Sequence, residues 1–77
     1  MSDSAQQVTL YTRKGCHLCD DALALLVEHG LEPKCIDVDE DARLRERFNE
    51  CVPVVEIDGK IRFRGRVVPV LLRRLLR

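Results

Sequence analysis

Two cysteines near the start of the chain, Cys16 and Cys19, are spaced for dithiol chemistry. They enclose a histidine and a leucine, directly after a short β-like run and directly before a long apolar one. A thiol pair at this spacing can hold a metal ion, form a structural disulfide or exchange disulfides with a substrate. The other two cysteines, Cys35 and Cys51, are single. Structural zinc sites usually pair their ligands twice, so we expect no metal at these residues.

Length and composition limit the remaining alternatives. The chain has 77 residues and a formal net charge of zero, so neither nucleic-acid nor membrane binding is expected. Residues 1–7 are polar and do not resemble a secretory signal, and the longest apolar run covers only residues 22–27. We therefore expect a cytoplasmic monomer, in a compartment that keeps thiols reduced and disfavours structural disulfides.

The dithiol must be positioned by the first strand and the first helix. Residues 8–12 alternate and contain β-branched and aromatic side chains, which predicts a strand. Apolar residues then recur at positions 19, 22, 23, 26 and 27, the spacing of one helix face, and Gly30 supplies the stop. Ala24 and Leu25 widen this stripe, so we expect the helix to be covered on more than one side.

The rest of the chain predicts a second strand, a short helix, a hairpin and a last helix. The strand covers residues 33–38, with Cys35 buried at its centre, and the helix covers about 40–49. Strands 54–57 and 60–63 flank Asp58-Gly59, a type I′ turn signal. Pro69 opens the last helix, with the apolar residues 68, 71, 72 and 75 on one face.

This order, β-α-β-α-β-β-α, predicts a three-layer α/β/α sandwich around a mixed four-stranded sheet. The first two strands should be parallel, because a helix connects them, and the last two form an antiparallel hairpin. We expect residues 1–7 to be a flexible N-terminal tail and residues 8–77 to be a single domain.

This framework places Cys16 where the first strand leads into the first helix. There its thiolate would face unpaired backbone N–H groups around Leu18 and Cys19, and the helix dipole would favour the anion. Arg13 and Lys14 add positive charge upstream, and Asp20 and Asp21 are expected to point outward. These effects predict a lowered pKa for Cys16.

Cys19 belongs to the apolar stripe, so its sulfur should be buried. An exposed thiolate with a buried partner suits thiol–disulfide exchange, because the first attacks a substrate disulfide and the second resolves the mixed disulfide.

A basic segment covers residues 60–77, which contain seven lysines and arginines and no acid. Lys60, Arg62 and Arg64 alternate with Ile61 and Phe63, which favours the charged solvent face of an edge strand. The alternative is a docking surface for an acidic protein partner.

These features resemble the glutaredoxin/thioredoxin superfamily, and most closely the small glutaredoxin-like proteins of the thioredoxin fold. The resemblance is carried by "VTLYTRKGCHLC", "CDDALALLVEHG" and "CVPVVEIDGK". It implies that Val52-Pro53 is the cis-proline segment facing the dithiol, where the Val52 backbone bonds a substrate as an added strand. Glutaredoxins usually have proline and tyrosine between the cysteines, and a Gly-Gly pair with a nearby aspartate after the hairpin. This chain has His17 and Leu18, and a single Gly65, so a protein disulfide becomes a stronger candidate than glutathione.

The sequence therefore predicts a thiol–disulfide oxidoreductase that reduces protein or glutathione mixed disulfides in cellular redox homeostasis. It is expected to bind no cofactor, with glutathione as a candidate co-substrate. The alternative is a non-catalytic thioredoxin-fold module that binds a partner or carries a metal or cluster. The expected site residues are Cys16 and Cys19 as catalytic thiols, Lys14, His17, Val52 and Pro53 in substrate binding, and Cys51 as an auxiliary thiol.

Overall fold

The computed structural model describes residues 7–48 and 51–75. Its elements, in chain order, are β1 (Val8–Thr12), α1 (His17–Glu28), β2 (Lys34–Asp37), the 3₁₀ turn η1 (Val38–Glu40), α2 (Ala42–Phe48), β3 (Val54–Ile57), β4 (Lys60–Arg64) and α3 (Pro69–Leu75). The predicted order of elements is confirmed. The second strand is shorter than expected, because Val38 already begins the 3₁₀ turn. Residue 49, the predicted end of the second helix, lies outside the described residues.

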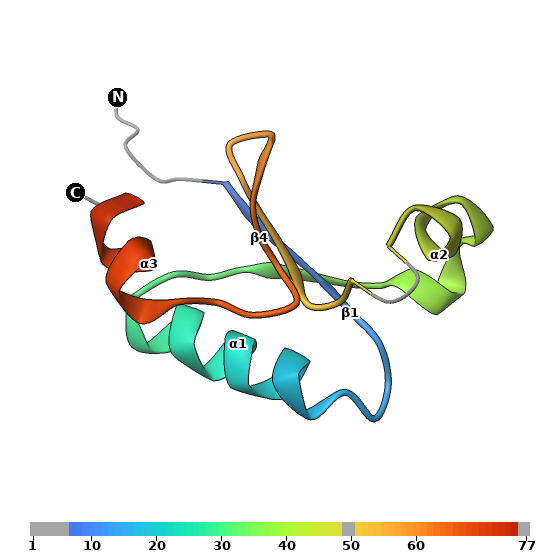
Figure 1. Ribbon diagram of the computed structural model, residues 1–77, viewed down its shortest axis with the longest axis horizontal. Coiled ribbons are helices and arrows are strands. Elements are labelled where there is room, and N and C mark those ends of the chain that lie inside the picture. Colours follow the sequence, from blue (N-terminus) through green and yellow to red (C-terminus); the bar gives the residue numbers. More distant parts are fainter. Residues whose placement is uncertain (1–6, 49–50, 76–77) are drawn as a thin grey trace.

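The four strands form one mixed sheet in the order β2-β1-β3-β4. Strands β1 and β2 are parallel, whereas β1 with β3 and β3 with β4 are antiparallel. Helices α1 and α3 pack on one face of the sheet and α2 on the other. In Figure 1, α2 lies at the end of the molecule opposite to α3. This is the expected three-layer arrangement of the thioredoxin-like fold.

Each face of the sheet has its own apolar core. On the face covered by α1 and α3, Leu10, Leu26 and Leu72 are fully buried against one another and their neighbours. On the α2 face, Phe48 is fully buried beside Tyr11, with 4.8 Å between the ring centroids. The sheet is therefore held from both sides, as two-faced burial of its strands requires.

The hairpin between β3 and β4 has the predicted turn and an unpredicted bulge. Asp58 and Gly59 both have positive φ, 53° and 85°, as a type I′ turn requires. Further along, Glu56 pairs with Ile61 but Val55 pairs with Phe63, so Arg62 is an extra residue in β4. The expected exposure of Lys60, Arg62 and Arg64 on an edge strand is confirmed. Ile61 and Phe63 nevertheless do not share a side of the sheet, because Ile61 packs on the α2 face and Phe63 on the opposite face.

The apolar stripes of the helices are less buried than their spacing predicted. On α1, Leu23 and Val27 are 36% and 55% exposed, so the expectation that this helix is covered on more than one side is wrong. On α3, Leu72 is fully buried but Leu71 is 44% exposed. Each helix contacts the sheet along one side only, and none of the other described elements covers its outer side in so small a domain.

Cys35 is exposed, which contradicts the predicted burial. It is aligned with the buried Leu10, but β2 is an edge strand and contributes no residue to the core described under α1 and α3. Both side chains can therefore share a face of the sheet and still differ in burial.

The predicted N-terminal tail falls mostly on residues 1–6, which lie outside the described residues. Gln7 extends the ladder beside the hairpin turn. Its N–H donates to Asp58 Oδ1 at 2.9 Å, and the Asp58 N–H donates to the Gln7 carbonyl at 2.8 Å. Among the described helices, none is both long and apolar enough to cross a membrane.

Candidate active site

Cys16 is the N-cap residue of α1. Its backbone is extended, with φ −91° and ψ 104°, and its Sγ accepts a hydrogen bond from the Cys19 N–H at 3.1 Å. Its carbonyl accepts the first helical bond, from the Asp20 N–H at 3.2 Å. Gly15, with φ +78°, allows the chain to turn from the loop into this cap. A sulfur replaces the usual side-chain oxygen of an N-cap, at the positive end of the helix dipole.

The two sulfurs of the motif are bonded and unequally exposed. Cys16 and Cys19 form a disulfide, with 5.2 Å between their Cα atoms. Cys19 is only 2% exposed, whereas Cys16 is half-buried at the surface. The helix produces this asymmetry, because the cap residue stands outside its first turn and Cys19 lies on the face that packs against the sheet.

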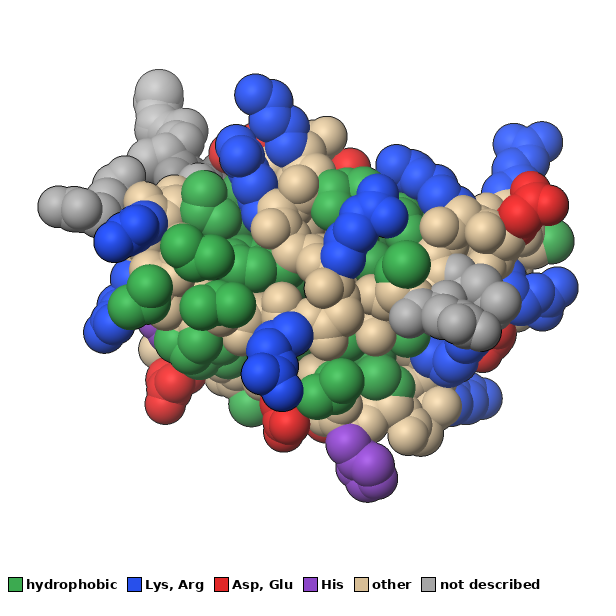
Figure 2. Space-filling view, viewed as in Figure 1, with side chains coloured by type: hydrophobic (Ala, Val, Ile, Leu, Met, Phe, Trp, Pro, Cys, Tyr) green, Lys and Arg blue, Asp and Glu red, His purple; other side chains and the backbone are tan. Residues whose placement is uncertain are grey.

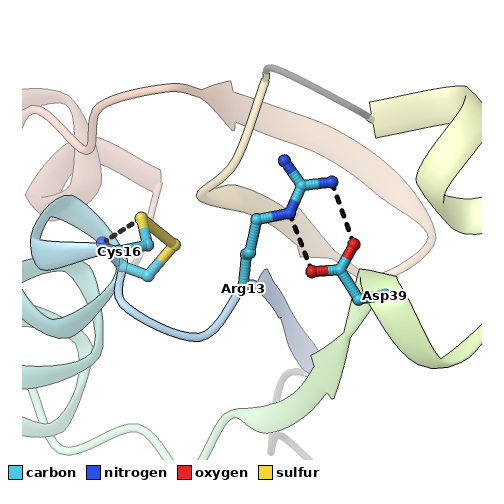
Figure 3. The surroundings of a disulfide bond; sticks show 4 residues. Arg13, Cys16 and Asp39 are labelled. Carbon is cyan, nitrogen blue, oxygen red and sulfur yellow. Dashed lines mark hydrogen bonds and ion pairs between the residues drawn. A yellow bond between two sulfur atoms is a disulfide. The ribbon is translucent and has the colours of Figure 1, made fainter.

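The positive charge of Arg13 is compensated by an acid rather than directed only at the dithiol. The Arg13 guanidinium holds the Asp39 carboxylate through two bonds, Nε to Oδ2 at 3.0 Å and Nη2 to Oδ1 at 3.1 Å. Figure 3 shows this side chain extending from the Cys16 loop toward Asp39. No local pattern predicts this pair, because an acid at position 39 is equally typical of a helix start. Lys14 is exposed, and Asp20 and Asp21 point outward as expected.

The segment before β3 contains the cis peptide bond that the resemblance implied, between Val52 and Pro53. Pro53 is buried, and its carbonyl accepts a hydrogen bond from the Gly65 N–H at 2.7 Å. Val52 is half-buried, and its backbone makes no hydrogen bond to another described residue. Its polar groups therefore have capacity for a further partner.

Two further residues were predicted to belong to the site, His17 and Cys51. His17 is exposed, and its side chain makes no hydrogen bond within the described part of the chain. Cys51 is a free, half-buried thiol whose side chain packs with the core on the α2 face, and its N–H donates to the Phe48 carbonyl at 2.9 Å. Its role as an auxiliary thiol stays a prediction.

A cavity beside the motif was not predicted. It has a volume of about 210 Å³ and lies between α1 and the segment after β4. Leu18 of the motif shares it with Arg66, which is 48 positions away in the chain, so only the folded topology could reveal it. Its lining residues are Leu18, Asp21, Ala22, Leu25, Arg66 and Val67. Elsewhere in the described residues, no three His, Cys, Asp or Glu side chains are grouped to hold a metal ion.

The comparisons with known proteins agree with this geometry. The family described as Glutaredoxin-like domain (DUF836) matches residues 7–77. The X-ray structure of target protein XcR50 from X. campestris is 32% identical, with a TM-score of 0.76 over 90% of this chain and 93% of that one. A search of curated proteins found no significant match.

Two named glutaredoxins share the fold at lower identity. Glutaredoxin 1 from Francisella tularensis, solved with cacodylate, is 21% identical, with a TM-score of 0.75 over 94% of this chain and 98% of that one. The buckwheat glutaredoxin–glutathione complex is 20% identical, with a TM-score of 0.62 over 78% and 62% of the two chains. Sequence, fold and dithiol geometry together show that this chain belongs to the family of glutaredoxin-like domains.

Proposed function

We propose that the protein is a small dithiol thiol–disulfide oxidoreductase, with Cys16 as the nucleophile and Cys19 as the resolving thiol. One observation carries the proposal: the Cys16 sulfur caps α1 and accepts the Cys19 N–H, while its bonded partner is buried beneath it. In the reduced protein the same N–H would stabilise a thiolate, because a hydrogen bond and the helix dipole both favour the charged form.

The reaction transfers two electrons from the dithiol to a substrate disulfide. The Cys16 thiolate attacks one substrate sulfur, forms a mixed disulfide and releases the other substrate sulfur as a thiolate, which takes up a proton. Cys19 then loses its proton and attacks Cys16 Sγ, which releases the second substrate thiol and forms the Cys16–Cys19 disulfide. Two equivalents of an external thiol reverse these steps and return the dithiol.

The substrate is a disulfide in a protein or a mixed disulfide with glutathione. The glutathione complex of the buckwheat glutaredoxin supports a glutathione-type thiol as reductant. The Val52 backbone next to Pro53, which has no hydrogen-bond partner among the described residues, supports a peptide substrate, which would bind there as a short added strand beside the dithiol. We propose a cytoplasmic location, because the dithiol must be returned to its reduced form. We also propose that the protein acts as a monomer with no bound cofactor.

The roles of the two cysteines are tested by trapping. Cys19→Ser should accumulate a mixed disulfide with a glutathionylated test protein, detected by mass spectrometry, whereas Cys16→Ser should form none and lose turnover. Cys35→Ser is the matched control, because it removes an exposed thiol outside the motif. If Cys16→Ser retained turnover, or Cys19→Ser trapped nothing, the assigned roles would be wrong and the non-catalytic binding module would be favoured.

A further inference from the structure

Strand β4 and helix α3 enclose a second cavity on the part of the molecule that carries the basic segment. It has a volume of about 310 Å³, at the lower end of the range of binding pockets. Its walls are apolar and its rim is basic. The lining residues are Arg62, Phe63, Leu71, Arg74 and Leu75, which we call the β4–α3 surface.

The apolar part of the β4–α3 surface is accessible from solvent. Leu71 is 44% exposed and Leu75 is half-buried, while Phe63 forms the floor and is 6% exposed. Beside them, Val70 on α3 is 48% exposed. Figure 2 shows apolar side chains interleaved with basic ones over this part of the molecule. Aliphatic side chains left in water next to a recess favour an apolar occupant.

The basic part of this surface has no ion-pair partner among the described residues. Arg62 and Arg74 are exposed, and the segment that contains them, residues 60–77, has no acidic residue. Within residues 7–48 and 51–75, neither side chain forms an ion pair, and the basic side chain that does so is Arg13. Arg62 is the extra residue of the bulge on an edge strand, so no residue of β3 is paired with it.

These observations favour a peptide as the occupant of the cavity over a nucleic acid or a lipid surface. Single strands of nucleic acid usually need exposed aromatic rings for stacking, but Phe63, the aromatic residue here, is buried. A lipid surface binds apolar side chains that protrude, whereas Phe63, Leu71 and Leu75 line a recess. A peptide with an apolar side chain between carboxylates satisfies both the cavity and its rim.

We propose that the β4–α3 surface is a docking site for an acidic, amphipathic segment of a protein partner. One apolar side chain of the partner enters the cavity against Phe63 and Leu71, and its flanking carboxylates reach Arg62 and Arg74. The inference goes beyond the redox reaction, because none of these residues belongs to the dithiol motif or to the segment before β3.

The experiment measures binding directly. The probe is a fluorescein-labelled peptide with a Leu-Phe pair between two glutamate pairs, titrated by anisotropy at low and high salt. The comparison ligands are the same peptide with lysine in place of glutamate, vesicles of phosphatidylglycerol and phosphatidylcholine, and a single-stranded DNA oligonucleotide. We expect saturable binding of the acidic peptide alone, weakened by salt because exposed charges are screened. In NMR spectra of the wild-type protein, the backbone amide signals that shift when the peptide is added should belong to β4 and α3.

Charge reversal identifies the surface. The variant Arg62→Glu/Arg74→Glu should weaken peptide binding about tenfold, which is about 1.4 kcal/mol. The matched control Arg43→Glu/Arg45→Glu, on the exposed side of α2, should stay within about twofold. The variant Cys16→Ser/Cys19→Ser should bind the acidic peptide as tightly as the wild type does, so the docking proposal is tested independently of the proposed redox activity. The proposal would be overturned if the acidic peptide showed no saturable binding, or if the two charge variants lost peptide affinity equally. It would also be overturned if the chemical-shift changes lay outside β4 and α3, or if vesicles or DNA bound more tightly than the peptide.

Discussion

The contact between Tyr11 and Glu56 joins the strand that leads into the dithiol loop to its antiparallel neighbour. The Tyr11 O–H donates to Glu56 Oε1 at 2.9 Å, and its ring packs 4.8 Å from the Phe48 ring. Tyr11 is 9% exposed, so its hydroxyl has little water to replace a lost partner. Because the pair holds β1 to β3 on the α2 face, we expect it to contribute measurably to the free energy of unfolding.

The perturbation is Tyr11→Phe, which removes the hydroxyl and keeps the ring. A hydrogen bond to a charged group contributes about 1.5–3 kcal/mol. Glu56 is half-buried and water can approach it after the change, so we expect a loss of about 1–1.5 kcal/mol, at or just below the lower limit of that range. For a domain of this size, that loss lowers Tm by about 5–10 °C.

The assay is a double-mutant cycle by urea unfolding of wild type, Tyr11→Phe, Glu56→Ala and the double variant. The cycle cancels changes in packing and strand propensity that each substitution makes by itself. We expect a coupling free energy of about 1 kcal/mol between the two positions. A coupling below about 0.3 kcal/mol would show that the bond does not stabilise the folded state, and would refute the reasoning.

The remaining predictions concern pH, the helix faces and the free thiols. Burial, followed by the hydrogen bond to Glu56, raises the pKa of Tyr11 above its ordinary 10.0, so the stabilisation is full below pH 10 and is lost as pH rises through the folded value. The stability difference between wild type and Tyr11→Phe should therefore shrink in urea titrations above pH 10. Leu26→Ala should cost about 2–5 kcal/mol, whereas Val27→Thr on the neighbouring exposed position should cost under about 0.5, measured by thermal unfolding. Cys35 should react with an alkylating reagent in the folded protein faster than half-buried Cys51, and equal rates by mass spectrometry would contradict the exposure difference.

Local patterns predicted the elements and the cap well. The position of Cys16 before an apolar helix stripe was enough to place its sulfur at the first turn, and Asp58-Gly59 was enough to define the hairpin turn. Both depend on neighbours in sequence. The cis bond before Pro53 came from resemblance to a family, since a single X-Pro pair carries no strong signal of its own.

Features that depend on distant neighbours were missed. Spacing identifies the apolar side of a helix but not how far the neighbouring elements extend, so it predicts burial for Val27 and Leu71, which are exposed. Position in a strand does not reveal whether the strand is at an edge, which is why the predicted burial of Cys35 was wrong. A single extra residue, Arg62, reversed the expected side of part of β4. The ion pair between Arg13 and Asp39 depends on the fold of a loop against a 3₁₀ turn.

The most direct measurement is the pKa of the Cys16 thiol in the reduced protein. It can be read from thiolate absorbance against pH in a Cys35→Ser/Cys51→Ser background, with Cys16→Ser added as the control that removes the signal. The Cys19 N–H and the helix start should hold this pKa clearly below the value of an ordinary cysteine, about 8.5. A value at or above about 8.5 would contradict the activation of Cys16 by the helix on which the proposed function rests.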